Sequence, residues 1–240
     1  MKKVLICSVL MIFLASSCLL NIGDKVKGSG NVTSEQRAVS SFDNIEIDGV
    51  FNIYLSQGDT ESVTVEIDDN LQQYVIVHNK GSKLVLDTKN NINFRKVTKN
   101  NLYIIIKDIH LLDIDGVGNV ETQTALRCKD LKLGIDGVGD CALELYCDRV
   151  ELDYDGVRNV ALRGKTVELI VDKDGVGNLN AEELEAQNVD ISNSGVGNAT
   201  VHASGELSIS NSGVGSVTYS GGATIEKLSS SGVGKVTKAD

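Results

Sequence analysis

The residues most able to do chemistry in this sequence are carboxylates that recur just before a repeated Gly-Val turn. Aspartates occupy the positions one and three residues before that turn, and they are Asp113, Asp115, Asp136, Asp153, Asp155, Asp172 and Asp174. Residues two apart on a strand point to the same side, so these side chains are expected to form outward columns of like charge. Carboxylate oxygens suit calcium, and these seven are the candidate calcium ligands of the chain.

Calcium would offset the repulsion within such a column, because two unit charges 4 Å apart in water repel by about 1 kcal/mol. No segment matches a calcium-loop signature, however, and solvated carboxylates are the more common reason for such a face. We therefore expect no resident cofactor, and calcium remains the alternative.

The sequence does not indicate a set of catalytic residues. The three histidines, His78, His110 and His202, show no clustered ligand spacing, and the repeats yield no nucleophile–base pair. Enzymes of the β-helix class that act on polysaccharides build their clefts from long loops, whereas the repeats here are nearly equal in length and leave no material for cleft walls. We expect a protein that is not an enzyme, with a polysaccharide-active β-helix as the minor alternative.

Two cysteines share a position in their repeats. Cys128 and Cys147 each lie nine residues before a turn glycine, so they are expected on adjacent strands about 4.8 Å apart, within the range for a disulfide. Later repeats place small residues at the same position, which favours cysteines packed as small hydrophobic side chains and leaves the disulfide open. Cys141 occupies an apolar position and is expected to be buried.

A short repeat of nearly constant length must position all of these side chains. Its turn glycines are Gly116, Gly137, Gly156, Gly175, Gly195, Gly213 and Gly232. Apolar residues recur four positions before and four positions after each glycine, with further apolar residues at spacings of two. This is strand periodicity within a repeat of solenoid length. The predicted fold is all-β, a single-stranded right-handed parallel β-helix with about 19 residues per rung.

The turn itself suggests three local expectations. The first glycine is expected to adopt positive φ, where it meets no Cβ penalty. The Asn or Asp that follows is expected to bond its own backbone, as turn residues do. The seven valines from Val117 to Val233 are expected to stack inward at one corner.

The chain divides into four segments. Residues 1–17 have two lysines, an apolar core and small residues before Cys18, which predicts a lipoprotein signal peptide with Cys18 as the lipidated residue. Residues 18–27 are expected to be a linker. Residues 28–108 are expected to form irregular or antiparallel strands that cap the solenoid, and residues 109–240 form the repeats.

The net charge of the chain limits the classes of partner that it can bind. The chain has 23 basic and 33 acidic side chains and a net charge of −10. Such a surface disfavours nucleic acid. The expected partners are a membrane, held through the lipid anchor at Cys18, and an unidentified protein or polymer, with self-association left open.

A family resemblance rests on an ordered set of short motifs. Gly28-Ser29-Gly30-Asn31-Val32 opens the set, the segment from Phe42 to Ile47 follows, and the glycine turns complete it. Together they resemble the bacterial family of auto-transporter adhesins with a head GIN domain. The resemblance implies an extracytoplasmic β-helical protein with an adhesive role. This chain has Gly-Val-Gly turns where many such sequences have Gly-Ser-Gly, and Arg158 replaces the second glycine once.

These patterns predict a lipid-anchored protein of the cell envelope, at the outer membrane, with the membrane side left open. Its expected role is adhesion or protein interaction through a flat polar and acidic face. The alternative is a structural envelope spacer or assembly component without a specific ligand.

Overall fold

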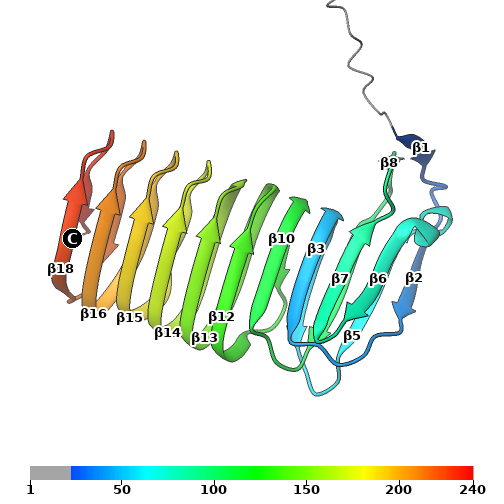
Figure 1. Ribbon diagram of the computed structural model, residues 1–240, viewed down its shortest axis with the longest axis horizontal. Coiled ribbons are helices and arrows are strands. Elements are labelled where there is room, and N and C mark those ends of the chain that lie inside the picture. The colour runs from blue at the N-terminus through cyan, green and yellow to red at the C-terminus, as the bar shows by residue number, and fades with distance from the viewer. Residues whose placement is uncertain (1–22, 240) are drawn as a thin grey trace, which may run out of the picture.

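The computed structural model describes residues 23–239, which form an elongated solenoid of stacked strands (Figure 1). The repeat strands are β10 (Leu111–Val117), β11 (Val120–Thr122), β12 (Leu126–Ile135), β13 (Val138–Tyr154), β14 (Val157–Lys173), β15 (Leu179–Asn193), β16 (Ala199–Asn211), β17 (Val217–Ser220), β18 (Thr224–Ser230) and β19 (Val236–Lys238). Strands of successive repeats pair in parallel, as Leu133 does with Leu152 and Leu152 with Val171. Pairing between equivalent positions of successive repeats confirms the predicted parallel β-solenoid.

The amino-terminal part adds rungs to the same sheet and then caps it. Its elements are β1 (Asp24–Lys27), β2 (Val32–Arg37), β3 (Asn44–Val50), β4 (Asn52–Gln57), β5 (Ser62–Asp68), the 3-10 helix η1 (Asp69–Tyr74), β6 (Val75–Lys80), β7 (Lys83–Thr88), β8 (Ile92–Arg95) and β9 (Asn100–Ile106). β3 and β4 pair in parallel with β10 and β11 on one side and with β7 and β9 on the other. β2, β5 and β9 run antiparallel, as do β6 and β7, so the predicted antiparallel strands are present.

The sheet continues across the expected boundary at residues 108 and 109, because β10 pairs directly with β3. Residues 24–27, which fall in the segment expected as a linker, form β1 and pair with β8.

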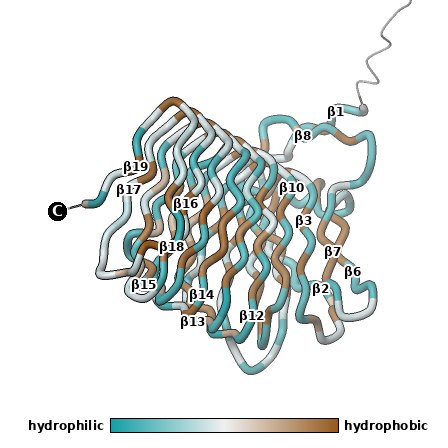
Figure 2. Tube along the Cα trace, turned by 60° about the vertical axis from the view of Figure 1, so that its left-hand side comes forward, coloured by the Kyte–Doolittle hydropathy of each residue, from teal (hydrophilic) through white to brown (hydrophobic). Residues whose placement is uncertain are grey.

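The core follows the predicted columns. Leu112, Leu133 and Leu152, each four residues before a turn glycine, are no more than 1% exposed. The residues four positions after the glycine, among them Val120 and Val160, are equally buried except Val236 in the last repeat. Apolar positions line up from rung to rung along the solenoid (Figure 2). One residue from each rung therefore stacks on the same residue of the next, which removes a continuous column of apolar side chains from water.

The valines of the turn face solvent, so the predicted inward stack is wrong. Val117 is 49% exposed, Val157 54% and Val176 47%. The reason is strand alternation. Leu152 and Tyr154 point inward and are buried, which places Gly156 inward and Val157 outward.

The two glycines of the turn have different roles. Positive φ was expected at the first glycine, but it occurs mainly at the second. Of the seven first glycines only Gly137 has positive φ, at 86°, whereas the second glycine has it in six repeats, as at Gly177 with φ 134°. The first glycine is needed because the rungs approach closely: a Cβ at Gly175 would collide with the carbonyl oxygen of Gly156. Glycine therefore serves close contact at the first position and conformation at the second, where Arg158, without positive φ, is the exception.

Candidate functional site

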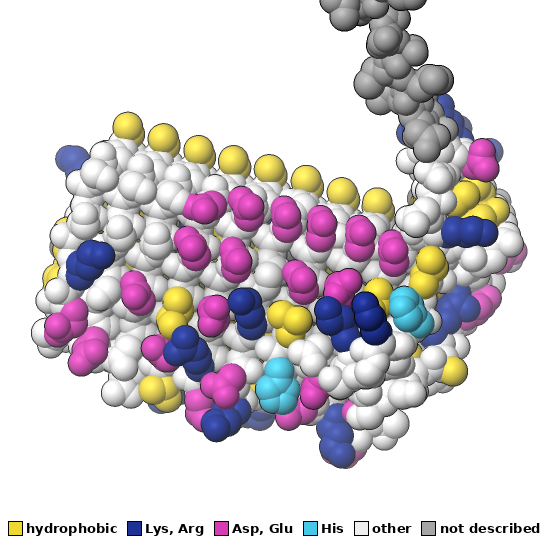
Figure 3. All heavy atoms as spheres, viewed as in Figure 1, with side chains coloured by type: hydrophobic (Ala, Val, Ile, Leu, Met, Phe, Trp, Pro, Cys, Tyr) yellow, Lys and Arg dark blue, Asp and Glu magenta, His cyan; other side chains and the backbone are white. Residues whose placement is uncertain are grey.

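The seven predicted aspartates lie on one face of the solenoid, in two rows (Figure 3). The row nearest the turn, called here the carboxylate row, consists of Asp87, Asp48, Asp115, Asp136, Asp155 and Asp174. The second row contains Glu46, Asp113, Asp153 and Asp172, with Gly134 as a gap. The outward direction that alternation predicts for these aspartates is confirmed, since Asp113 is half-buried and the other six are exposed.

Three members of the two rows were missed from the sequence. Asp48 and Glu46 come from β3, which pairs with β10 although β4 to β9 come between them in the chain. Asp48 precedes Gly49-Val50 as Asp115 precedes Gly116-Val117, and this was the available signal. Asp87 lies near the end of β7, which no Gly-Val turn follows, so only the fold places it beside Asp48.

Burial and then repulsion within the rows raise the pKa of three carboxyls. Burial raises the pKa of Asp113, and the charges of Glu46, Asp115 and Asp136 raise it further, while Lys83 opposes them. Burial followed by the neighbouring Asp174 and Asp153 raises the pKa of Asp172. Burial and then Asp87, Asp115 and Glu46 raise the pKa of Asp48.

Cations do little to neutralise these rows. Within residues 23–239, none of the seven predicted aspartates has a lysine or arginine within ion-pair distance. In the second row Lys83 Nζ lies 2.6 Å from Glu46 Oε2. The face therefore carries a net negative field that is open to solvent.

The rows do not converge on a metal site. Among the described residues, no group of three or more His, Cys, Asp or Glu side chains is placed to hold an ion. The physical reason is geometric: parallel side chains on a flat sheet stay about 4.8 Å apart, whereas calcium needs six to eight oxygens around one point. The seven calcium candidates are thus neighbours in rows rather than a coordination shell.

Beside the carboxylate row runs a line of exposed valines, called here the valine ridge (Figure 3). Its members are Val50, Val117, Val138, Val157, Val176, Val196, Val214 and Val233, which are between 47% and 73% exposed. Backbone bridges join successive members, as between Val157 and Val176. The ridge places apolar side chains at the edge of the solenoid, one per rung.

The other flank of the ridge is an amide row, formed by the Asn or Asp three residues after the first glycine. The asparagines of the row each accept a hydrogen bond from the backbone N–H of the next rung, rather than from their own turn as expected. Asp140 instead accepts from the side-chain amide of Asn159. Asn159 Oδ1 accepts from Asn178 N at 3.2 Å, and Asn178 Oδ1 accepts from Asn198 N at 2.9 Å. These residues hold neighbouring rungs together and leave the carboxylates as the free polar groups beside the ridge.

Beneath the ridge lies a buried polar column that sequence reasoning did not identify. Arg158 turns inward and donates to the carbonyl oxygens of Gly118 at 2.8 Å and Gly116 at 2.9 Å. Lys173, fully buried, donates to the carbonyls of Gly175 and Val196 at 3.4 and 3.3 Å. Burial lowers the pKa of the Lys173 amine. Both buried cations thus have hydrogen-bond partners inside the solenoid, although the carbonyls of Gly175 and Val196 also accept backbone N–H groups. Arg158 replaces the second glycine without breaking β14.

The family follows from this chain-wide pattern. The family model described as Putative auto-transporter adhesin, head GIN domain, matches residues 41–223. The chain belongs to this GIN-domain family. No curated protein matches it.

Solved structures support the GIN-domain fold. A putative adhesin from Bacteroides fragilis NCTC 9343 is 28% identical with a TM-score of 0.87, covering 89% of this chain and all of that one. A putative adhesin from Parabacteroides distasonis ATCC 8503 is 23% identical (TM-score 0.64), covering 90% of this chain and all of its own. A structure described as a putative lipid binding protein from the same strain is 20% identical (TM-score 0.69), with the same coverage. The two Parabacteroides distasonis structures show a similarity of fold alone to this chain.

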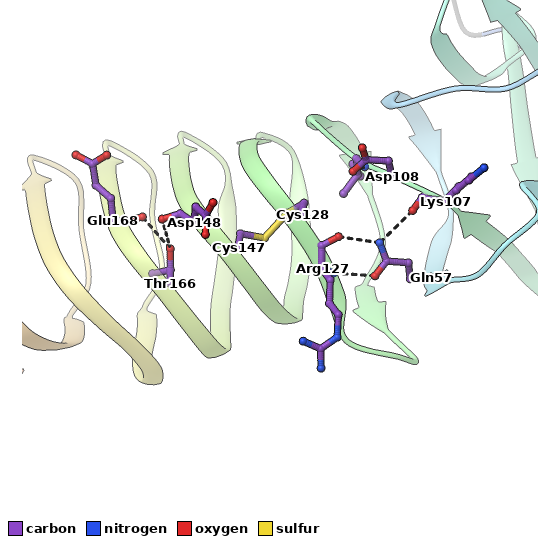
Figure 4. Close-up of a disulfide and its surroundings, with 10 residues drawn as sticks. Gln57, Lys107, Asp108, Arg127, Cys128, Cys147, Asp148, Thr166 and Glu168 are labelled. Atoms are coloured by element: carbon purple, nitrogen blue, oxygen red, sulfur yellow. Dashed lines mark hydrogen bonds between the residues drawn. A yellow bond between two sulfur atoms is a disulfide. The ribbon is translucent and has the colours of Figure 1, made fainter.

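The GIN-domain solenoid contains a disulfide in the cysteine position that the sequence had left open. Cys128 and Cys147 are in register on β12 and β13, with 4.7 Å between their Cα atoms, and their sulfurs are bonded (Figure 4). The expectation that packed thiols are favoured at this position is therefore wrong, because the strand register brings both side chains to the same side. Cys141 is buried as predicted, and burial raises the pKa of its thiol to about 12.

A cleft of about 660 Å³ lies beside this disulfide and includes His202 in its lining. His202 Nδ1 lies 2.9 Å from Ser220 Oγ, a pairing that the repeat columns were expected not to produce. Both residues lie seven positions after a turn glycine, which was the overlooked signal. Among the described residues no carboxylate lies within ion-pair distance of His202. The pair thus lacks the third group that orients a catalytic base.

Two expectations concern the membrane. Cys18 and the predicted signal segment lie outside the described residues, so the lipid anchor stays a prediction. Among residues 23–239, no helix is long and apolar enough to cross a bilayer.

Proposed function

We propose that this GIN-domain protein is an extracytoplasmic adhesion or interaction module that binds its partner through the face carrying the two carboxylate rows. The observation that carries the proposal is the array itself: carboxylates repeat at one position per rung across β7, β3 and β10 to β14, without paired cations at the seven predicted aspartates. Membership of an adhesin-type family points the same way.

The array suits many weak contacts rather than one strong one. Outward side chains on successive rungs repeat about every 4.8 Å, so a repetitive or extended partner meets the same group several times. Each contact holds the next at high effective concentration, and avidity grows with the number of rungs engaged. A binding role also fits the GIN-domain solenoid better than catalysis, because among the described residues no carboxylate lies within ion-pair distance of His202 to orient the His202–Ser220 pair.

The proposed location is the cell envelope, with Cys18 lipidated and the solenoid held at the outer membrane. Small residues directly before Cys18 and an apolar segment too short to span a bilayer support this proposal. Replacing Cys18 with serine should release the protein into the soluble fraction with its solenoid folded. Metabolic labelling with a radioactive fatty acid tests it, and retention of the unlabelled variant in membranes would contradict the anchor.

A structural spacer or assembly component is the second candidate, and one observation favours it. β18 and β19 pair with earlier strands on one side only within the described chain. Ile225 and Leu228 of β18 are 45% and 47% exposed. An open edge of this kind is a template for pairing with another chain. Concentration-dependent association that is lost on replacing Leu228 with lysine would favour this role.

The test of the leading proposal uses the Cys18→Ser chain as bait for envelope proteins and glycans. A second bait carries Asn in place of Asp115, Asp155 and Asp174. A partner captured by the first bait in a salt-sensitive manner, and lost from the second, would support binding through the carboxylates. Equal capture by both baits across a salt series would mean that the carboxylates are only solvated surface groups and do not bind the partner.

A further inference from the structure

The valine ridge is an exposed apolar feature that the core does not require. Its side chains point away from the buried columns, and seven of its eight members are close to half exposed. Single exposed valines are common, but a continuous apolar strip along a whole edge is typical of an interaction site.

The polar rows on the two flanks of the ridge limit the kinds of partner that can bind over it. On one flank the amide row is occupied in hydrogen bonds between rungs. On the other flank the carboxylate row accompanies the ridge from Val50 to Val176, and serines replace it in the last three rungs. The apolar strip and the unneutralised negative charge therefore lie side by side over five rungs.

Charge complementarity separates the candidate occupants. A second copy of the chain stacked ridge to ridge supplies no cation in either orientation: antiparallel stacking brings its carboxylate row to the same side as the first, and parallel stacking sets that row against the amide row. An anionic lipid surface meets the same repulsion. A cationic partner gains instead, because it offsets the like-charge repulsion that, after burial, raises the pKa of Asp48 and of the second-row carboxyls Asp113 and Asp172.

The spacing between rungs indicates whether a cationic protein segment would match the ridge better as a helix or as an extended strand. Four steps along the ridge span about 19 Å. Four turns of an α-helix span about 22 Å, and flexible lysine or arginine side chains absorb a mismatch of about 3 Å. An extended strand presents side chains on one face every 6.8 Å or so, and four steps of it span about 27 Å, which loses register with the rungs.

We propose that the valine ridge and the adjoining carboxylate row form the docking edge for a cationic amphipathic α-helix of a protein partner. The apolar stripe of the helix packs on the valines from Val50 to Val176, and its lysines or arginines lie over the carboxylates. This inference rests on the proposed binding function and adds to it the ridge and the partner's chemistry.

The probe is a synthetic 18-residue helix of leucine and lysine with one apolar stripe, labelled for fluorescence anisotropy. The protein is the Cys18→Ser chain. The ridge variant replaces Val138, Val157 and Val176 with threonine, which keeps the β-branched shape while exchanging a methyl for a hydroxyl. The matched control is Val167→Thr, an exposed valine away from the ridge, at 48% exposure. A charge variant replaces Asp136, Asp155 and Asp174 with asparagine.

The ridge variant should bind the helix about tenfold more weakly than wild type, because it loses three apolar contacts. The Val167 control should bind as wild type does, and the charge variant should bind weakly with a reduced dependence on salt. Circular dichroism and urea unfolding establish that each variant is folded.

Three results would overturn the inference, and they are distinguishable from failure of the proposed function. If the folded ridge variant binds as tightly as wild type while the charge variant does not, the carboxylate face binds but the ridge does not. If neither variant loses affinity, the helix binds elsewhere and the docking edge is wrong, whereas the proposed function is decided by capture with the two baits. If wild type ignores the helix but binds phosphatidylglycerol vesicles, the partner is a lipid surface.

Discussion

Replacing Asp172 with asparagine should stabilise the protein, because it removes repulsion within the carboxylate face. Asp153 lies directly across on the neighbouring strand and Asp174 lies two residues along on the same side. Those separations are about 4.8 and 6.8 Å. In bulk water they correspond to repulsions of about 0.9 and 0.6 kcal/mol. Screening at 0.15 M salt reduces their sum to about 0.7 kcal/mol, and 1 M salt reduces it to about 0.2 kcal/mol.

Urea unfolding at two salt concentrations measures this gain, since guanidinium chloride would itself screen the charges. Asp190→Asn is the matched control, because its neighbours across the strands are Ile170 and Ser208 and it lacks a carboxylate partner there. The Asp172 variant should gain about 0.7 kcal/mol at 0.15 M salt. Most of that gain should vanish at 1 M salt, while the control stays unchanged.

The gain should also depend on pH with a defined sign. Burial, Asp174 and Asp153 raise the pKa of Asp172 in the folded protein, so its ionised form is destabilised there. Wild type therefore recovers stability relative to the variant as pH falls through the raised folded pKa, and the difference disappears below the ordinary carboxyl pKa of about 4. Equal gains for both variants, or a gain that survives at 1 M salt and at low pH, would refute repulsion as the cause.

Three further predictions concern the frame that carries the face. Replacing Cys128 and Cys147 together with alanine should lower the free energy of unfolding by about 3 kcal/mol, because the bond closes a loop with a sequence separation of 19; equal denaturation midpoints for the variant and wild type would contradict this. Gly177→Ala places a side chain at positive φ against the preceding rung and should destabilise by at least about 1–3 kcal/mol, whereas Gly222→Ala, with open space around it, should be nearly silent in the same thermal melts. Arg158→Met leaves turn carbonyls without their donor and should lose about 3 kcal/mol; urea unfolding that matches wild type would show that the buried guanidinium adds no net stability.

The sequence by itself determined the solenoid and its register. Leu133 and Leu152 stand at the same place in successive repeats, and a parallel sheet stacks such residues because each rung then buries the same face. The outward direction of Asp153 and Asp155 followed from alternation alone. Local period and residue type were sufficient for these features, because every repeat supplies the same information again.

The tertiary structure decided which residues from distant parts of the chain become neighbours, and which side chains of the turn face inward. Asp48 and Asp87 join the carboxylate row only because the chain returns and sets β3 and β7 against the first regular rung. Strand alternation turned the repeated valines outward, since the inward places at the corner belong to side chains such as Tyr154 and Lys173. A repeat shows which positions are equivalent from rung to rung. Which side of the chain is buried at a corner depends on whether strand alternation continues through the turn, and the packed fold decided that.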